Sequence, residues 1–192
     1  MNKNAEIALQ FLLEGNRRFA GFRSLHPHQD ENRLNECTGG QKPVAAVVTC
    51  SDSRVPPEVI FDCGIGDIFI IRTAGTVLDY AAVGSIEYAV DHLNVPLILI
   101  LGHTSCGAVT AAMRMGADAH EGALGTLLET IKKACAAVHE TEINEIVKHY
   151  TKIVANDVQT NEPVIKRAVE NGLTVVVPAC YSLENGIVEV LN

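Results

Sequence analysis

Val44-Ala45-Ala46-Val47-Val48-Thr49-Cys50-Ser51-Asp52-Ser53-Arg54 joins an apolar run to a polar stretch that carries a thiol, a carboxylate and a guanidinium. A second apolar run, Leu97 to Leu101, precedes His103-Thr104-Ser105-Cys106. Continuous apolar runs of this length are typical of strands buried on both faces of a parallel sheet. If the two runs are parallel neighbours, both polar stretches leave the sheet at its carboxyl edge, where open α/β sheets place their ligand sites.

The rest of the chain alternates helical patterns with short apolar runs. Strands are predicted at 44–49, 68–71, 97–101 and 173–177, and helices at 58–62, 79–93, 108–115 (stopped by Gly116), 124–138, 142–158 and 163–170. The dipeptide Asn185-Gly186 is a strong turn signal before a terminal hairpin or edge strand at 187–191. This order predicts an α/β fold with a mainly parallel central β-sheet flanked by helices, an N-terminal helical arm and a C-terminal edge strand.

The N-terminal part has a different composition. Residues 5–20 have the apolar spacing of an amphipathic helix, and Gly15-Asn16 predicts a break or bend in it. Residues 22–42 are polar and predict a surface connection or extended arm, long enough to reach a second subunit. At 192 residues the chain is most simply one domain, 1–192, of which 1–42 form the N-terminal helix and arm.

The composition excludes several classes of function. A net charge of −8 argues against a general nucleic-acid or anionic-membrane binder. No apolar run approaches the roughly 18 residues of a membrane span, and the N-terminus lacks the features of a signal or transit peptide, so a cytoplasmic location is expected. Six cysteines in a reducing compartment indicate metal ligation or packing rather than disulfides.

Cys50, His103 and Cys106 together predict a metal site. A single buried cysteine is usually a small packing residue, but these three donors would meet at one sheet edge. Cys106 also falls where the next helix begins, and a helix N-terminus favours the thiolate that a metal requires. Two cysteines and a histidine form a ligand set of catalytic zinc sites, in which the fourth position stays open. The predicted cofactor is therefore Zn²⁺.

Asp52 and Arg54 can be interpreted in two ways. On spacing alone they can form an exposed ion pair, which is worth about 0–1 kcal/mol. Beside two metal ligands, the favoured interpretation is that Asp52 lies near the metal and Arg54 holds it by a bidentate contact.

These residues also carry a family resemblance. Cys50-Ser51-Asp52-Ser53-Arg54, paired with His103-Thr104-Ser105-Cys106-Gly107, resembles the two-part signature of the β-class carbonic anhydrases. The likeness extends from Leu12-Leu13-Glu14-Gly15-Asn16 to the strand at Val175. The resemblance implies a zinc enzyme that interconverts CO₂ and bicarbonate. It also implies a homodimer, or a higher even oligomer, whose N-terminal helices embrace the partner subunit.

The resemblance assigns roles position by position. It implies the zinc ligands Cys50, His103 and Cys106, the catalytic dyad Asp52 and Arg54, and the substrate-pocket residues Gln41, Phe69, Tyr88 and Gly107. In the family, some of the pocket residues face the partner subunit's zinc. From the residues alone, Phe69 and Tyr88 would be interpreted as packing residues and Gln41 as an ordinary loop residue.

The implied mechanism is attack of zinc-bound hydroxide on CO₂, with Asp52 orienting the hydroxide and Arg54 holding Asp52. In one form of the family the aspartate is instead the fourth zinc ligand, and a bicarbonate pocket uses a tryptophan shortly before the first cysteine. Here Val47 stands at the matching position and the chain has no tryptophan. The open form, with water on zinc, is therefore expected. Thr73 departs from the family, which often carries asparagine there.

Three alternatives remain open at this point. The same metal chemistry would serve a hydrolase of carbonyl sulfide or carbon disulfide. A noncatalytic zinc-stabilised module or bicarbonate sensor would instead have a closed four-ligand site or one with no exchangeable water. A nucleotide-binding sheet is disfavoured because no Gly-x-Gly-x-x-Gly follows the first strand.

Overall fold

The computed structural model describes residues 2–114 and 121–192, in which five strands form one sheet of order β2-β1-β3-β4-β5. The strands are β1 (Ala45–Cys50), β2 (Ile68–Thr73), β3 (Leu97–His103), β4 (Val175–Tyr181) and β5 (Val188–Val190). The first four run parallel, and β5 pairs antiparallel with β4. The prediction of a mainly parallel sheet with a C-terminal edge strand is confirmed.

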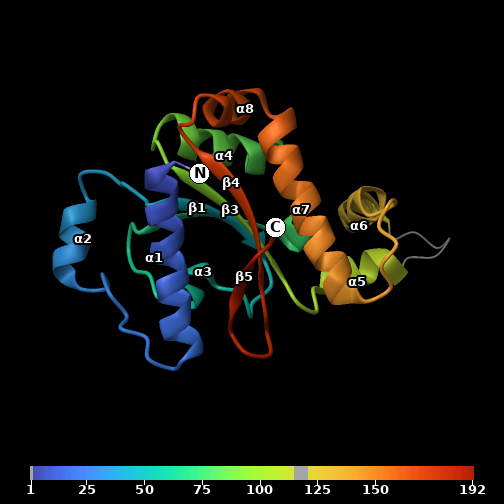
Figure 1. The fold of residues 1–192 in the computed structure, drawn as a ribbon, viewed down its shortest axis with the longest axis horizontal. Helices are drawn as coiled ribbons and strands as arrows, with labels where there is room; N and C mark the ends of the chain where they lie inside the picture. Colours follow the sequence, from blue (N-terminus) through green and yellow to red (C-terminus); the bar gives the residue numbers. More distant parts are fainter. Residues whose placement is uncertain (1, 115–120) are drawn as a thin grey trace.

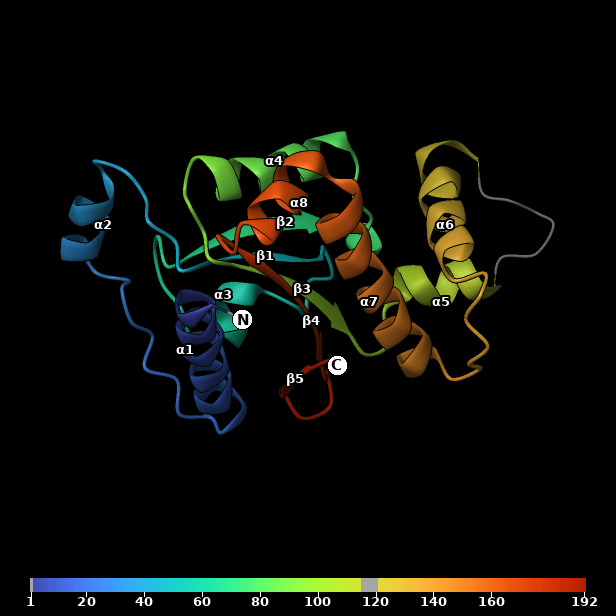
Figure 2. The same cartoon turned by 45° about the horizontal axis from the view of Figure 1, so that its top comes forward.

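Helices cover both faces of this sheet (Figures 1 and 2). They are α1 (Lys3–Ala20), α2 (Glu31–Cys37), α3 (Pro57–Ile60), α4 (Tyr80–Asp91), α5 (Gly107–Arg114), α6 (Gly122–Ala134), α7 (Ile143–Asn161) and α8 (Pro163–Glu170), with a short 3₁₀ turn, η1, at Ala74–Thr76. Figure 2 shows α4 and α8 on one side of the sheet and α1 and α3 on the other. The helix α2 stands apart at the edge of the molecule.

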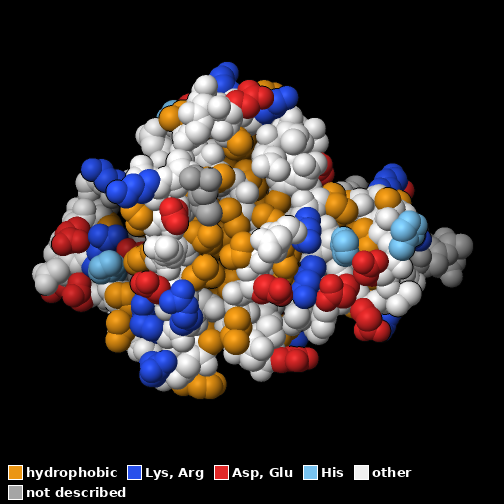
Figure 3. Space-filling view, viewed as in Figure 1, with side chains coloured by type: hydrophobic (Ala, Val, Ile, Leu, Met, Phe, Trp, Pro, Cys, Tyr) orange, Lys and Arg blue, Asp and Glu red, His pale blue; other side chains and the backbone are white. Residues whose placement is uncertain are grey.

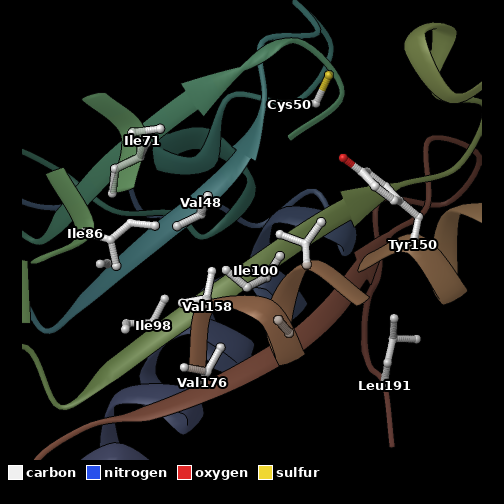
Figure 4. Close-up of a cluster of buried hydrophobic side chains, with 14 of the residues drawn as sticks. Val48, Cys50, Ile71, Ile86, Ile98, Ile100, Tyr150, Val158, Val176 and Leu191 are labelled. Atoms are coloured by element: carbon white, nitrogen blue, oxygen red, sulfur yellow. The ribbon is translucent and has the colours of Figure 1, made fainter. Parts of the chain in front are cut away.

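Successive side chains along each strand point to opposite faces of the sheet, so the hydrophobic core has two halves, one on each face. Val48, Ile98 and Ile100 belong to the half covered by α4, α7 and α8, and Figure 4 shows them among helix residues such as Ile86 and Val158. Val47 and the leucines of β3 belong to the half covered by α1 and α3. Each fully buried aliphatic side chain contributes about 1.5–3 kcal/mol to folding. The central strands are therefore held rigidly from both faces.

The helix α1 differs from the sequence-based expectation. It continues without a break through Gly15 and Asn16. A Cβ atom at Gly15 would lie 1.8 Å from the carbonyl oxygen of Phe61, so glycine is required for close packing and does not break the helix. The Asn16 amide donates to the carbonyl of Gly186 and accepts from the N–H of Val188. Both residues thus join α1 to distant parts of the chain.

The arm at 22–42 is also more ordered than expected. It contains α2, which Asp30 caps by accepting a hydrogen bond from the N–H of Arg33 at 2.9 Å. The buried carboxylate of Asp62 accepts from Arg18 Nε at 2.6 Å and from the N–H groups of Leu25 and His26. These contacts fasten the start of the arm to the body of the molecule.

Other boundaries also differ from the prediction: α6 ends at Ala134 instead of residue 138, and α7 continues to Asn161 instead of ending at residue 158. The strand β4 begins at Val175 instead of Leu173 and continues to Tyr181, which pairs with His103 at the end of β3. The predicted stop of the helix α5 at Gly116 lies outside the described residues.

One face of the molecule is notably apolar. Figure 3 shows hydrophobic side chains gathered between α1 and α7, with charged side chains around the rim. A shallow groove on α1 is lined by Ile7, Phe11, Val44 and Pro96, and Ile7 is 55% exposed. Across residues 2–114 and 121–192, no helix is long and apolar enough to cross a membrane.

Candidate metal centre

The ends of β1 and β3 bring the two motifs of the sequence together. These strands are parallel neighbours, with Thr49 opposite Leu101, so Cys50 and His103 end their strands at the same edge of the sheet. Cys106 follows three residues later, just before α5 begins. The predicted meeting of the two stretches at the carboxyl edge is confirmed.

Three donor atoms converge there. The sulfurs of Cys50 and Cys106 and a ring nitrogen of His103 all lie within 4.8 Å of one another. The three residues are 6%, 3% and 1% exposed. In a tetrahedral site with metal–sulfur bonds of about 2.3 Å, the donors lie roughly 3.5–4 Å apart. Small side-chain movements are therefore enough for all three to bind one ion.

The ring of His103 is already prepared for this role. Its Nδ1 lies 3.0 Å from the carbonyl oxygen of Thr104, which only accepts, so Nδ1 carries the proton. The other ring nitrogen, Nε2, is then unprotonated and has a free lone pair. It is buried and has no hydrogen-bond partner among the described residues. A buried polar atom without a partner is costly, and a metal ion satisfies it.

The two sulfurs form a coupled pair. A hydrogen bond with Cys106 outweighs the effect of burial and lowers the pKa of Cys50 below its usual value. The same bond, together with burial, raises the pKa of Cys106. The N–H of Gly75, in η1, also donates to Cys50 Sγ at 3.3 Å. The pair thus shares a proton that a metal ion displaces, because metals bind thiolates.

Asp52 and Arg54 form the predicted bidentate pair. Arg54 Nε lies 2.9 Å from Asp52 Oδ1 and Nη2 lies 2.8 Å from Oδ2. These bonds hold the pKa of Asp52 well below its usual range, in spite of partial burial. Asp52 Oδ2 is also 3.9 Å from His103 Nε2. An ionised carboxylate therefore borders the point where the three donors converge.

Arg72, to which the sequence assigned no role, supports the same loop. From β2 it donates through Nε to the carbonyl of Cys50 at 3.1 Å and through Nη2 to that of Asp52 at 2.7 Å. These contacts join residues about 20 positions apart. A motif search has no signal for them, because they depend on the pairing of β1 with β2.

The predicted pocket residues are not all near the metal ligands. Gly107 begins α5 directly after Cys106. Phe69 is paired with Ala46 near the start of β1, whereas Cys50 is at its end. The ring of Phe69 packs on Tyr88 of α4, with centroids 6.1 Å apart.

Gln41 is exposed on the arm, before β1 begins. Cys50 is paired with Thr73, four positions along β2 from Phe69, which is roughly 13 Å at about 3.3 Å per residue. Within one chain, Phe69 and the Tyr88 that packs on it therefore lie away from Cys50, and Gln41 lies before the opposite end of β1. The structure therefore brings together the three ligands, the Asp52–Arg54 pair and Gly107, and separates them from the other three pocket residues.

Comparisons with known proteins agree with this geometry. The family model described as Carbonic anhydrase matches residues 45–188. The protein named Carbonic anhydrase 2 from Mycobacterium tuberculosis is 38% identical over 193 residues, which cover 96% of this chain and 92% of that protein. The carbonic anhydrase of Mycolicibacterium smegmatis is 37% identical over 194 residues, covering 98% and 94%.

Solved structures give the same result. The Coccomyxa β-carbonic anhydrase in complex with acetazolamide superposes with a TM-score of 0.76 at 26% identity, covering 94% of this chain and 84% of that one. One of two tetrameric β-carbonic anhydrases from Sordaria macrospora has a TM-score of 0.73 at 26% identity and covers 96% of both chains. With its family match over three quarters of its length and its Cys-His-Cys metal site, this chain belongs to the β-class carbonic anhydrases.

Proposed function

We propose that this protein catalyses the reversible hydration of CO₂ to bicarbonate and a proton at a zinc ion held by Cys50, His103 and Cys106. The single observation that carries the proposal is the convergence of these three buried donors beside the ionised Asp52. Two thiolates and one imidazole suit zinc and leave a fourth coordination position available. When bound, zinc supplies a nucleophile at neutral pH by lowering the pKa of water from about 15.7 to near 7.

Asp52 orients the nucleophile. Its ionised carboxylate is an acceptor only, so it takes a hydrogen bond from the attacking oxygen and directs the lone pair of that oxygen toward CO₂. One C–O bond forms, one C=O bond of CO₂ becomes the C–O⁻ of bicarbonate, and the proton released from water leaves to solvent. Because Arg54 keeps Asp52 ionised, the carboxylate does not itself take that proton.

Arg54 fixes the carboxylate. Both oxygens of Asp52 are engaged by the guanidinium, at 2.9 and 2.8 Å. A carboxylate held in this way is poorly placed to leave Arg54 and become a metal ligand. This contact, together with Val47 and the absence of tryptophan, supports the open form of the centre, in which Asp52 is not a ligand.

The complete substrate pocket requires a second subunit. Gln41, Phe69 and Tyr88 lie away from the metal ligands of their own chain, and the apolar face beside α1 is uncovered in the single chain. The tetrameric proteins of Sordaria macrospora are examples of oligomeric relatives. We therefore infer a homodimer, or an even multiple of it, in which these three residues face the partner subunit's zinc. Analytical ultracentrifugation tests this, and a monomer at micromolar concentration contradicts it.

Stopped-flow measurement of CO₂ hydration, combined with zinc analysis of the same sample, tests the proposed reaction. We expect about one zinc per chain and hydration that is lost on chelation and restored by zinc. Turnover of carbonyl sulfide or carbon disulfide, but not of CO₂, would reassign the substrate. If the protein binds zinc but turns over neither CO₂ nor these two gases, it would be a noncatalytic zinc module.

A further inference from the structure

Two of the three metal ligands, His103 and Cys106, are joined by a loop of two residues that is held on several sides. The N–H of Thr104 donates to the carbonyl of Tyr181 at 2.9 Å. Its Oγ1 accepts from the N–H of Leu183 at 3.0 Å. The next peptide, that of Ser105, donates its N–H to Asn144 Oδ1 at 2.8 Å. The first two contacts come from β4 and the loop after it, and the third is a side chain from the first turn of α7.

The helix α7 is firmly attached to the sheet at this level. Ile146 and Val147, which follow Asn144, are 3% and 2% exposed. A Cβ atom at Gly102 would lie 2.1 Å from Thr151 Oγ1, so α7 approaches β3 closely at the residue before His103. The position of Asn144 is therefore set relative to the strand that carries His103. Its carboxamide oxygen is a rigidly mounted acceptor.

Ser105 is the point in the loop that most needs such an acceptor. Its φ is 56°, in the left-handed region that non-glycine residues adopt only when the surroundings hold them there. Its carbonyl oxygen lies 3.4 Å from Arg54 Nη2, the nitrogen that also bonds Asp52. The Ser105 peptide thus lies between Asn144 on one side and the Asp52–Arg54 pair on the other.

Water is the alternative acceptor for this N–H, since Ser105 is exposed. A water molecule would satisfy the hydrogen bond, but it would not fix where the N–H lies, because water is not attached to α7. The difference between Asn144 and water therefore concerns geometry more than folding.

We propose that Asn144 is a positioning residue of the metal centre. By holding the N–H of Ser105, its Oδ1 sets the spacing of His103 and Cys106 and the place of Arg54. The proposal rests on the proposed function for its effect on CO₂ hydration, but its effect on metal binding does not.

The experiment compares Asn144→Ala with Asn144→Asp, which keeps an acceptor and suits the first turn of a helix. Asn156→Ala, at an exposed asparagine of the same helix, is the matched control. The rate at which the full-length protein releases zinc to a colorimetric chelator is measured for each. We expect release about tenfold faster in Asn144→Ala, the low end of the range for groups that support metal ligands. Asn144→Asp and the control are expected to stay within about twofold of the unchanged protein.

A second measurement separates positioning from general stability. The visible absorption of the Co²⁺-substituted protein reports the geometry of the ligands, and the thermal midpoint of the same samples reports folding. We expect Asn144→Ala to change the Co²⁺ bands while its midpoint stays near that of Asn156→Ala, and Asn144→Asp to restore the bands. Asn144→Leu, which keeps the size and removes the acceptor, gives the same test if Asn144→Ala does not fold.

The proposal is overturned if Asn144→Ala has the same zinc-release rate and the same Co²⁺ bands as Asn156→Ala. It is equally overturned if Asn144→Asp behaves like Asn144→Ala, since the acceptor would then be irrelevant. If the unchanged protein binds zinc without hydrating CO₂, the proposed function fails, while the zinc-release comparison still decides the role of Asn144.

Discussion

Arg54 binds both carboxylate oxygens of Asp52, through Nε at 2.9 Å and Nη2 at 2.8 Å, and its backbone N–H adds a third bond to Oδ1 at 2.9 Å. Asp52 is 16% exposed, whereas Arg54 is about half exposed. The carboxylate is therefore fixed in direction and charge by a group that remains accessible to water. This relationship makes Asp52 an oriented acceptor beside the metal ligands.

Replacing Asp52 by asparagine is expected to leave zinc bound and to reduce CO₂ hydration at least about 100-fold, the scale expected when a reacting group is no longer held in the right orientation. The amide has nearly the same size but carries no charge, and Arg54 then orients it poorly. Stopped-flow hydration and zinc analysis measure the two effects. The control is Asp157→Asn, at an exposed aspartate of α7, which should keep full activity. Full activity in Asp52→Asn would remove its catalytic role.

Cys106→Ser is expected to lose zinc, because a serine hydroxyl is a much weaker ligand for zinc than a thiolate. Cys37→Ser, at a half-buried thiol outside the metal centre, should keep a full complement of zinc. Elemental analysis after dialysis measures both. Retention of zinc in Cys106→Ser would show that the ligand set is wrong.

Gly15→Ala is expected to destabilise the protein by about 1–3 kcal/mol, as for other overpacked sites. The added Cβ would meet the carbonyl oxygen of Phe61 at 1.8 Å, so α1 must move away from α3. Gly84 is the matched control, since it lies within α4 and a Cβ there meets no described atom within 4 Å. Gly84→Ala should therefore be stabilising, by up to about 1 kcal/mol. Urea unfolding measures the change in the free energy of unfolding for both variants. Equal changes would contradict the close approach of α1 to the carbonyl of Phe61.

Asp62→Asn is expected to destabilise the protein by about 2 kcal/mol at pH 7, as for other hydrogen bonds to a charged group. Burial acts to raise the pKa of Asp62, but the N–H groups of Leu25, Arg18 and His26 outweigh it, and the pKa is lowered on folding. The ionised carboxylate therefore adds stability above its unfolded pKa of about 3.9, and this is lost as the pH falls through the lower folded value.

The gap in urea midpoint between the unchanged protein and Asp62→Asn should then be constant above about pH 5 and shrink toward pH 3. Asp30→Asn serves as the control, because asparagine caps a helix as well as aspartate does. A gap between the unchanged protein and Asp62→Asn that grows with acid would reverse the assigned sign.

Contacts within one segment of the chain were predictable, and contacts between segments were not. The Asp52–Arg54 pair joins residues two apart, and the strand assignments follow from apolar runs. Asn144 and Arg72 support the ligand loops from 39 and about 20 residues away, and no local pattern indicates either contact. Gly15 was misinterpreted for the same reason, since the carbonyl that requires a glycine there belongs to Phe61 of a distant segment.

The sequence by itself determined the donor set and the order of strands and helices, because residue chemistry and hydrophobic periodicity are local properties. Only the tertiary structure decided that β1 lies between β2 and β3, which places the thiol of Cys50 within reach of His103 and Cys106. It also placed Phe69 opposite Ala46, four residues along β1 from Cys50. The reason is that strand order and helix packing depend on how all the apolar surfaces are buried at once, and no single stretch of the chain contains that information.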